Sequence, residues 1–310
     1  MVQTEVAASL RALLAQSIDY AGLFPPTTLA LEPALKNHAA YVRSNEAWML
    51  ATFVLPVKKF AEAAWFVSEF DQTYPLRISA LAPKTINAID FIEELKMAAR
   101  GIREFAGENV KAVQISQLEM PVPAGIDEGM LNKMRDILEG LPVRAFWETP
   151  MQEAERIISL LAEHNARARE QRFNFKLRTG GITADAFPTS AQIAQVLIAA
   201  GKHRVPIKFT AGLHHPIRMF RDEVKTTMHG FLNVLGAGVL AIEHGWTEQQ
   251  TAAMLEDENA DSFVFDNGVF RWREWKIGAT EIEKHRRLIT SFGSCSFDEP
   301  REDLRALKLL

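Results

Sequence analysis

The sequence predicts an α/β protein folded as a TIM-like (β/α)8 barrel with an added C-terminal β-hairpin. Short apolar runs alternate with segments of helical periodicity along most of its 310 residues. Successive apolar runs are about 30 residues apart, which is the size of a βα unit in a parallel sheet. No glycine-rich phosphate-binding fingerprint follows any of these runs, which disfavours the alternative, an open doubly wound sheet.

Six apolar runs have the length and composition of buried strands. They cover residues 48–57, 76–82, 110–116, 143–148, 173–179 and 206–212. The segment "SIDYAGLF", from residue 17, and one late strand bring the number to eight and close the barrel. The late segment 229–245 fits either a strand or a buried helix, because its Gly236-Ala-Gly238 step leaves the periodicity ambiguous.

Helices are predicted between the strands, from apolar spacing near 3.6 residues. These segments are 58–70, 85–106, 126–139, 151–164 and, last in the chain, 279–291. Another helix has Thr189 or Ser190 as its N-cap and Gly201 as its stop, and "TEQQ" at 247–250 resembles a capping box. In 262–275, Asp-Asn-Gly between two alternating runs predicts the hairpin.

Composition indicates a cytoplasmic protein with a single domain over residues 1–310. The net charge is −4 and no lysine or arginine run occurs, so nucleic acid is not an expected partner. The only cysteine, Cys295, fits a reducing compartment. Residues 1–16 have the pattern of an amphipathic helix and not of a signal peptide, and no apolar run approaches the roughly 18 residues of a membrane span. Nothing in the pattern indicates an oligomeric state.

Charged and polar residues stand at the ends of three neighbouring strands, where (β/α)8 barrels place their active sites. They are Glu148, then Lys176, Arg178 and Thr179, then Lys208 and Thr210. Strand alternation places Lys176 and Arg178 on one face and Lys208 and Thr210 on one face. We therefore expect both lysines to point into the barrel from adjacent strands.

This cluster predicts a lysine with a lowered pKa. Each cation disfavours protonation of its neighbours, and burial acts in the same direction. A neutral lysine forms a Schiff base with a carbonyl compound. Two alternatives stay open: the lysines bind an anion without attacking it, or they pair with internal carboxylates.

Glycines close both lysine strands, in "RTGG" and "TAG". Gly180, Gly181 and Gly212 allow backbone N–H groups to approach a ligand closely, and with Arg178, Thr179 and Thr210 they form a candidate anion site. The alternative is an ordinary tight turn. The expected partner is a small anionic metabolite.

His214, His215 and His229 raise a competing hypothesis, in which they bind a divalent metal ion together with Glu148 or Asp19. Adjacent histidines on an extended strand point in opposite directions, and no HxH or HExxH spacing occurs. His214 or His215 as a proton carrier is the simpler interpretation, and it requires no cofactor. The segment "GSCSFDEP" carries Cys295, for which the sequence shows neither a base nor a lowered pKa.

The pair "FKLRTGG" and "IKFTAG" resembles class I aldolases of the deoxyribose-phosphate aldolase type. The resemblance is local, and "GLHHP" departs from it. It implies a barrel in which Lys176 forms the Schiff base and Lys208 tunes it, with Glu148 and Glu119 as candidates for the catalytic acid. The segments "IDYAGLFPP", "TAGLHHP", "HGFLN" and "GSCSFDEP" resemble the signatures of a bacterial and plant family, which implies no mechanism.

Together these observations predict an enzyme that acts on a small anionic carbonyl compound, such as a sugar phosphate or a keto acid. The expected reaction is that of a lyase of the aldolase type or an isomerase. The alternatives are a metal-dependent hydrolase or isomerase that uses the three histidines, and a non-catalytic protein that binds an anionic metabolite.

Overall fold

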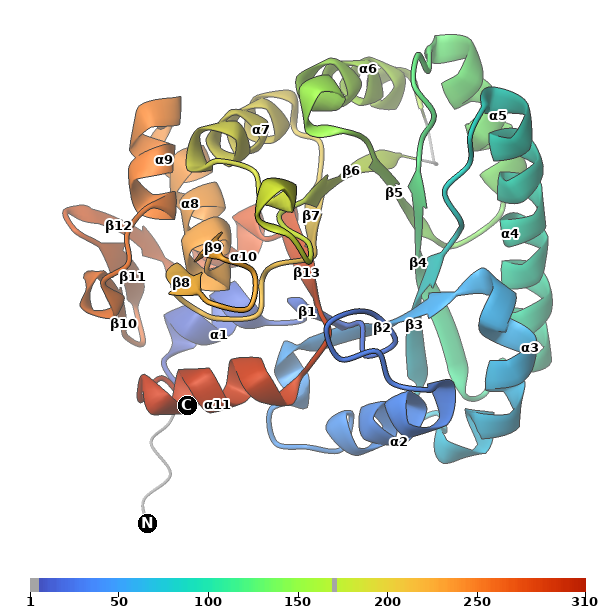
Figure 1. The fold of residues 1–310 in the computed structure, drawn as a ribbon, viewed down its shortest axis with the longest axis horizontal. Helices are drawn as coiled ribbons and strands as arrows, with labels where there is room; N and C mark the ends of the chain where they lie inside the picture. Colours follow the sequence, from blue (N-terminus) through green and yellow to red (C-terminus); the bar gives the residue numbers. More distant parts are fainter. Residues whose placement is uncertain (1–5, 169–171) are drawn as a thin grey trace.

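The computed structural model describes residues 6–168 and 172–310, and Figure 1 shows their fold. Within these residues, parallel strands close into a barrel in the order β1-β13-β7-β6-β5-β4-β3-β2. The strands are β1 (Ile18–Tyr20), β2 (Leu50–Pro56), β3 (Leu76–Leu81), β4 (Val113–Pro121), β5 (Arg144–Glu148), β6 (Phe173–Arg178), β7 (Ile207–Thr210) and β13 (Ile289–Ser294). The predicted (β/α)8 barrel is confirmed.

Helices are arranged around the barrel (Figure 1). They are α1 (Ala8–Leu14), α2 (Leu31–Tyr41), α3 (Phe60–Ala63), α4 (Ala88–Glu108), α5 (Glu128–Leu138), α6 (Ala154–Arg167), α7 (Ser190–His203), α8 (Phe231–His244), α9 (Glu248–Leu255), α10 (Ala279–His285) and α11 (Asp298–Ala306). None of the helices in the described residues is both long and apolar enough to cross a membrane. Residues 1–5 of the predicted N-terminal helix lie outside the described residues.

Two helices begin where side-chain caps predict. Thr189 and Gln192 form a reciprocal capping box at the start of α7, and Thr247 and Gln250 form another at the start of α9. Each box satisfies backbone N–H groups that the first helical turn leaves unpaired. The predicted stop of α7 at Gly201 is wrong, because the helix continues through His203.

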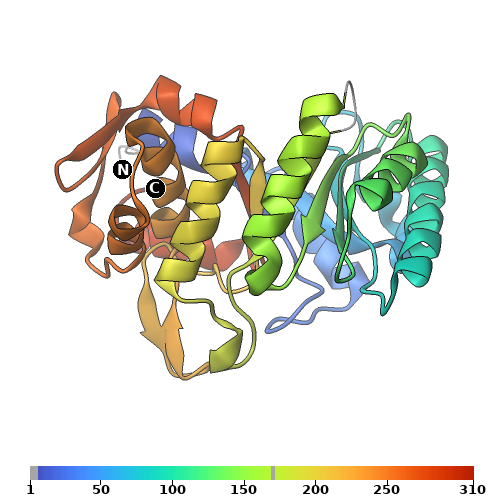
Figure 2. The same ribbon diagram turned by 90° about the horizontal axis from the view of Figure 1, so that it is seen from above.

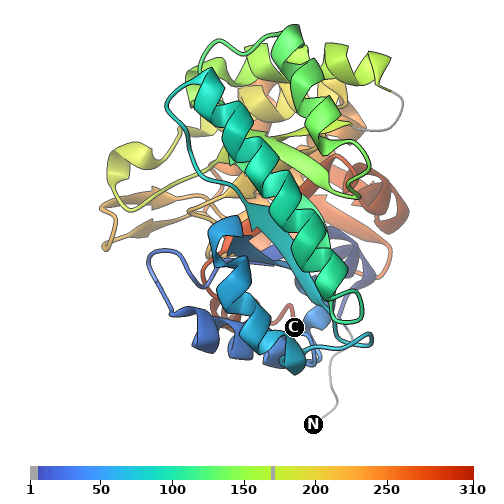
Figure 3. The same cartoon turned by 90° about the vertical axis from the view of Figure 1, so that its right-hand side faces the viewer.

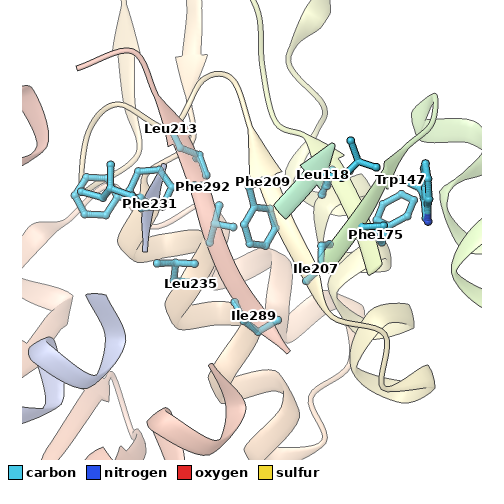
Figure 4. Close-up of a cluster of buried hydrophobic side chains, with 14 of the residues drawn as sticks. Leu118, Trp147, Phe175, Ile207, Phe209, Leu213, Phe231, Leu235, Ile289 and Phe292 are labelled. Carbon is cyan, nitrogen blue, oxygen red and sulfur yellow. The ribbon is translucent and has the colours of Figure 1, made fainter. Parts of the chain in front are cut away.

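The layer between strands and helices is apolar, as Figure 4 shows. Phe175 and Leu177 of β6 and Ile207 and Phe209 of β7 are buried on the outward face of the barrel wall. Strand alternation therefore turns the residues between them, including both lysines, toward the barrel axis.

The structure decides the open alternative for 229–245 in favour of a helix and corrects two other predicted elements. Residues 231–244 form the buried helix α8, in which Gly238 allows close approach to Ile289 of β13. The eighth barrel strand is β13, whose first residues were assigned to the final helix; that helix, α10, ends at His285. Segment 58–70 holds only a short α-helix flanked by 3-10 turns.

Two small antiparallel sheets extend the barrel. The predicted hairpin is part of a three-stranded sheet formed by β10 (Phe263–Phe265), β11 (Val269–Trp272) and β12 (Trp275–Gly278). A second hairpin, β8 (Met219–Arg221) with β9 (Thr226–Met228), was not predicted. Figures 2 and 3 show that this hairpin and the loop after β6 project beyond the same end of the barrel.

Candidate active site

A cavity of about 550 Å³ opens at the carboxyl ends of the barrel strands. Many of the residues that the sequence singled out line it: Glu148, Lys176, Arg178, Gly180, Gly181, Lys208, Thr210, Gly212 and His214. Glu119, Lys84 and Cys295 line it as well. Enzymes built on (β/α)8 barrels carry their active sites at this end.

Lys176 of β6 and Lys208 of β7 are direct neighbours in the barrel wall, since they are paired in the strand register. Their side chains are 4% and 1% exposed. A buried ammonium group is unstable unless acceptors replace its hydration shell. The carboxylates of Asp19, Glu119 and Glu148 supply those acceptors.

Glu119 stands between the two lysines. Its Oε2 lies 2.8 Å from Lys176 Nζ, and its Oε1 lies 2.5 Å from Lys208 Nζ. Ser79 Oγ donates a further hydrogen bond to Oε1. Burial raises the pKa of this carboxyl, but Lys176 and Lys208 lower it by more, so its net pKa lies far below its ordinary value and the group is ionised.

A bulge in β4 aims Glu119 into the barrel. The register with β3 shifts so that Ile115 pairs with Ile78 and Gln117 pairs with Ser79, leaving Ser116 as the extra residue. Before the bulge, the buried outward residues are Val113 and Ile115. After it, they are Leu118 and Met120, so the residues with odd numbers now point inward. A β-bulge of this kind changes which face the following side chains occupy.

Lys208 has an acceptor for each of its three N–H groups. Its Nζ lies 2.8 Å from Asp19 Oδ2, 2.5 Å from Glu119 Oε1 and 2.6 Å from Gln117 Oε1. Asp19 in turn accepts hydrogen bonds from Thr52 and Ser291. An ammonium group has three donors, so this environment fixes Lys208 in one position.

Lys176 is held by two carboxylates. Its Nζ lies 2.8 Å from Glu119 Oε2 and 2.9 Å from Glu148 Oε2. Burial lowers the pKa of Lys176, but Glu119 and Glu148 raise it by more, so the net pKa lies above its ordinary value. The prediction of a lysine with a lowered pKa is therefore wrong for the unliganded protein, because the sequence pattern did not reveal how closely the carboxylates approach.

Glu148 links the buried cluster to the cavity. Its Oε1 accepts a hydrogen bond from Arg178 Nε at 3.0 Å, and the Arg178 side chain is 52% exposed. Burial raises the pKa of Glu148, but Lys176 and Arg178 lower it by more, so it is below its ordinary value. The cluster thus contains three carboxylates, of Asp19, Glu119 and Glu148, against the cations of Lys176, Lys208 and Arg178.

The glycines shape one side of the cavity. Gly212 has a φ of +78°, and a side chain on Gly180 would meet the Gly212 Cα at 2.9 Å. Thr179 does not contribute its hydroxyl to a ligand site, since Thr179 Oγ1 donates to the Ala211 carbonyl at 2.6 Å and the residue is fully buried. The predicted role of the Thr179 hydroxyl in substrate binding is not what this hydrogen bond indicates. The hydroxyl instead joins the end of β6 to the end of β7.

His214 lines the cavity beside Cys295. Its Nδ1 lies 3.5 Å from Cys295 Sγ and 3.7 Å from Glu299 Oε2. Burial, followed by the charge of His215, lowers the pKa of His214 to about 4. Burial also raises the pKa of the Cys295 thiol. Both groups are therefore neutral near pH 7.

The other two histidines lie away from the cavity lining. His215 Nδ1 lies 2.7 Å from Asp303 Oδ2 of α11, and His229 Nε2 lies 2.7 Å from the Pro188 carbonyl. Across residues 6–168 and 172–310, no three His, Cys, Asp or Glu side chains are grouped to hold a metal ion. The hypothesis of a site formed by His214, His215 and His229 is therefore wrong, as is a catalytic role for His215 in this cavity.

Comparison with known proteins adds no family assignment. No protein-family model matches the chain, and no curated protein matches it. The fold and the residues of the cavity therefore carry the functional argument.

Proposed function

We propose that this protein is a lyase of the aldolase type, in which Lys176 forms a Schiff base with a small carbonyl compound that carries an anionic group. The observation that carries the proposal is the pair of lysines on adjacent strands, both within 3 Å of Glu119, at the catalytic end of a (β/α)8 barrel. Glu148 supplies the proton acceptor that this chemistry needs, and Glu119, between the two amines, supplies the electrostatic partner.

The number of acceptors favours Lys176 over Lys208 as the nucleophile. All three donors of Lys208 face acceptors, and one of them belongs to Asp19, deep in the barrel. Lys176 has two acceptors among the described residues, which leaves one direction of its Nζ toward the cavity. Lys208 acts as the positioning residue that holds Glu119 ionised.

The reaction begins with proton transfer from Lys176, which is protonated in the unliganded protein, to Glu148 Oε2 at 2.9 Å. The neutral amine attacks the carbonyl carbon, and Glu148 returns the proton to the carbonyl oxygen. Loss of one water leaves a protonated Schiff base. Overall, an ammonium group and a carbonyl group give an iminium ion and water, so no proton is gained or lost.

Carbon–carbon cleavage follows from the same groups. A base removes the proton of a hydroxyl on the β-carbon, an aldehyde departs, and the bonding electron pair moves to the iminium nitrogen to form an enamine. His214 serves as this base, because it lines the cavity and is neutral at physiological pH. His214 returns this proton to the enamine carbon. Hydrolysis of the resulting iminium ion by water then releases the second carbonyl product and regenerates protonated Lys176.

The anionic group of the substrate binds at the cavity rim. Arg178 reaches solvent while its Nε is fixed by Glu148, which leaves its remaining N–H donors available for a phosphate or a carboxylate. Lys84 adds a second cation, and the backbone around Gly180 and Gly181 permits close approach of an anion.

Borohydride reduction tests the proposal. The purified protein is incubated with a panel of phosphorylated aldehydes, ketones and keto acids, reduced, and analysed by intact mass. We expect a single covalent adduct with at least one compound. Lys208→Met should retain this adduct at a reduced rate, Lys176→Met should lose it, and Lys111→Met, an exposed control, should match the wild type.

Two results would contradict the assignment. An adduct that persists in Lys176→Met, in a variant that still unfolds cooperatively, would remove Lys176 from its role. No adduct with any compound, combined with a rise in melting temperature on addition of phosphate or keto acids, would favour a protein that binds an anionic metabolite without transforming it.

A further inference from the structure

A second cavity, of about 490 Å³, lies at the opposite, amino-terminal end of the barrel. Its walls come from the first residues of strands β2 to β5 and from the segment that leads into β13. Four arginines line it: Arg77, Arg144, Arg286 and Arg287. Glu283 is the acidic residue among the lining side chains of the described chain.

Strand alternation directs two of these arginines into the barrel. Arg77 precedes Ser79 by two positions on β3, and Arg144 precedes Phe146 by two positions on β5, so each shares a face with a residue of the barrel interior. The interior of such barrels is ordinarily filled by apolar branched side chains. Arginines at these positions keep the amino-terminal end of the barrel open and positively charged.

Arg286 is fixed at the edge of this cavity. Its guanidinium donates to the carbonyls of Ile289 and Thr290, and to that of Ala15 at 3.1 Å. Its Nε is buried and has no acceptor among the described residues. Burial, and in addition the charge of Arg144, lower the pKa of Arg286 to about 10, although Asp19 raises it.

Within residues 6–168 and 172–310, none of the four arginines lies within ion-pair distance of an aspartate or glutamate. Asp19 acts on Arg144 and Arg286 through its charge without forming an ion pair with either. Elsewhere in the protein arginines are commonly paired, as Arg156 is with Glu153 and Arg301 with Glu46. A group of like charges inside a concave surface is repulsive unless an anion occupies it.

We propose that this cavity binds a small polyanion with at least two phosphate groups. Guanidinium groups match phosphate oxygens through paired N–H donors, and the cavity has the size of a small-molecule site. One phosphate carries about −1.5 to −2 charges at neutral pH, so the surplus positive charge requires more than one. Thr52, Gln114 and Ser116 line the same cavity and add neutral hydrogen-bonding groups.

This site is distinct from the candidate active site. Thr52, Gln117 and Ser291 line the lower cavity, and their polar groups are hydrogen-bonded to Asp19 or Lys208, which close the barrel above them. Phe146 fills the space between Arg144 and Lys208, with each cation 5.2 Å from its ring centroid. The proposed polyanion site is therefore independent of the chemistry at the carboxyl ends of the barrel strands.

Calorimetric titration with inorganic pyrophosphate at low ionic strength tests the proposal. We expect at least one site per chain in the wild type. Arg144→Gln and Arg77→Gln should each weaken binding about tenfold or more, because each removes a charge-assisted contact. Arg100→Gln, on the surface of α4, should leave the dissociation constant unchanged.

Melting temperatures give a second measurement. Pyrophosphate should raise the melting temperature of the wild type more than that of Arg144→Gln. The proposal is overturned if millimolar pyrophosphate does not bind, or if Arg178→Gln weakens binding and Arg144→Gln does not. Inorganic phosphate that binds as tightly as pyrophosphate would overturn the requirement for more than one phosphate.

Discussion

Replacing Glu119 by glutamine removes the negative charge that the two buried lysines share. The variant keeps the size and one oxygen acceptor of the side chain, while two ammonium groups are left with Asp19 and Glu148. Breaking a buried ion pair from one side typically costs about 3–5 kcal/mol, because the remaining charge stays buried without compensation.

The free energy needed to deprotonate one lysine sets an upper limit on this loss of stability, and its value is similar. The variant can relieve the excess charge by releasing one lysine proton. A lysine with an ordinary pKa of about 10.4 requires about 1.4 kcal/mol per pH unit to become neutral, or about 5 kcal/mol at pH 7. We therefore expect Glu119→Gln to lower the free energy of unfolding by about 3–5 kcal/mol at pH 7.

Urea unfolding followed by circular dichroism measures this loss. Glu93→Gln is the matched control, since Glu93 forms an exposed pair with Lys96 on α4 at 2.8 Å and its side chain is 62% exposed. The control should lose no more than about 0.5 kcal/mol.

The stability contributed by the Glu119 carboxylate should depend on pH. The pKa of Glu119 is lowered in the folded protein, so its contribution is fully present above its unfolded pKa of about 4.3 and is lost as the pH falls further. The difference between wild type and Glu119→Gln should therefore shrink below that pH. A loss at pH 7 no larger than that of Glu93→Gln would refute the view that this carboxylate neutralises both lysines.

Three further substitutions test the surroundings of the site and the buried histidine of α2. Thr179→Val should lower the free energy of unfolding by about 1–2 kcal/mol in urea, because the Ala211 carbonyl loses its buried donor; an unchanged value would contradict the bond. Gly180→Ala should cost about 1–3 kcal/mol by overpacking, since its Cβ would lie 2.5 Å from Phe187 Cε1, and equal melting temperatures would contradict this. Burial lowers the pKa of His38 to about 3 in the folded protein, whereas its pKa in the unfolded chain is about 6.5. As the pH falls from about 6.5 toward about 3, the free energy of unfolding should therefore decrease by up to about 1.4 kcal/mol per pH unit. His38→Phe should remove this part of the slope, and urea midpoints at pH 5 and pH 7 that shift as in the wild type would count against it.

The barrel and both lysines were predictable because they depend on local patterns. The strand around Lys176 and the strand around Lys208 alternate without interruption, so counting by two gives the inward face directly. Caps such as Thr189 and Thr247 depend on residues three positions apart, which the sequence also displays.

The electrostatic state of the lysines was not predictable, because it depends on partners far along the chain. Asp19 and Glu119 reach Lys208 from strands β1 and β4. The alternation of Val113 and Ile115 places Glu119 on the outer face, and only the bulge at Ser116 turns it inward. A strand pattern alone does not show such an extra residue.

The last barrel strand was missed for a related reason. Residues 279–291 continue an apolar spacing that suits a helix, but the helix ends at His285, which lies 2.7 Å from Glu243 of α8. The segment from Ile289 then joins β1 and β7 to close the barrel. This closure is a tertiary contact, which overrides a weak local preference for helix.

Peptide mapping of the reduced adduct tests the central claim most directly. Protein treated with a reactive carbonyl compound and borohydride is digested, and the modified lysine is located by fragmentation. Because the proton of Lys176 passes to Glu148 within the site and not to solvent, labelling in a fixed time should change little with pH near neutrality. The account predicts modification of Lys176 with Lys208 unmodified; modification of Lys208, or of exposed lysines alone, would contradict it.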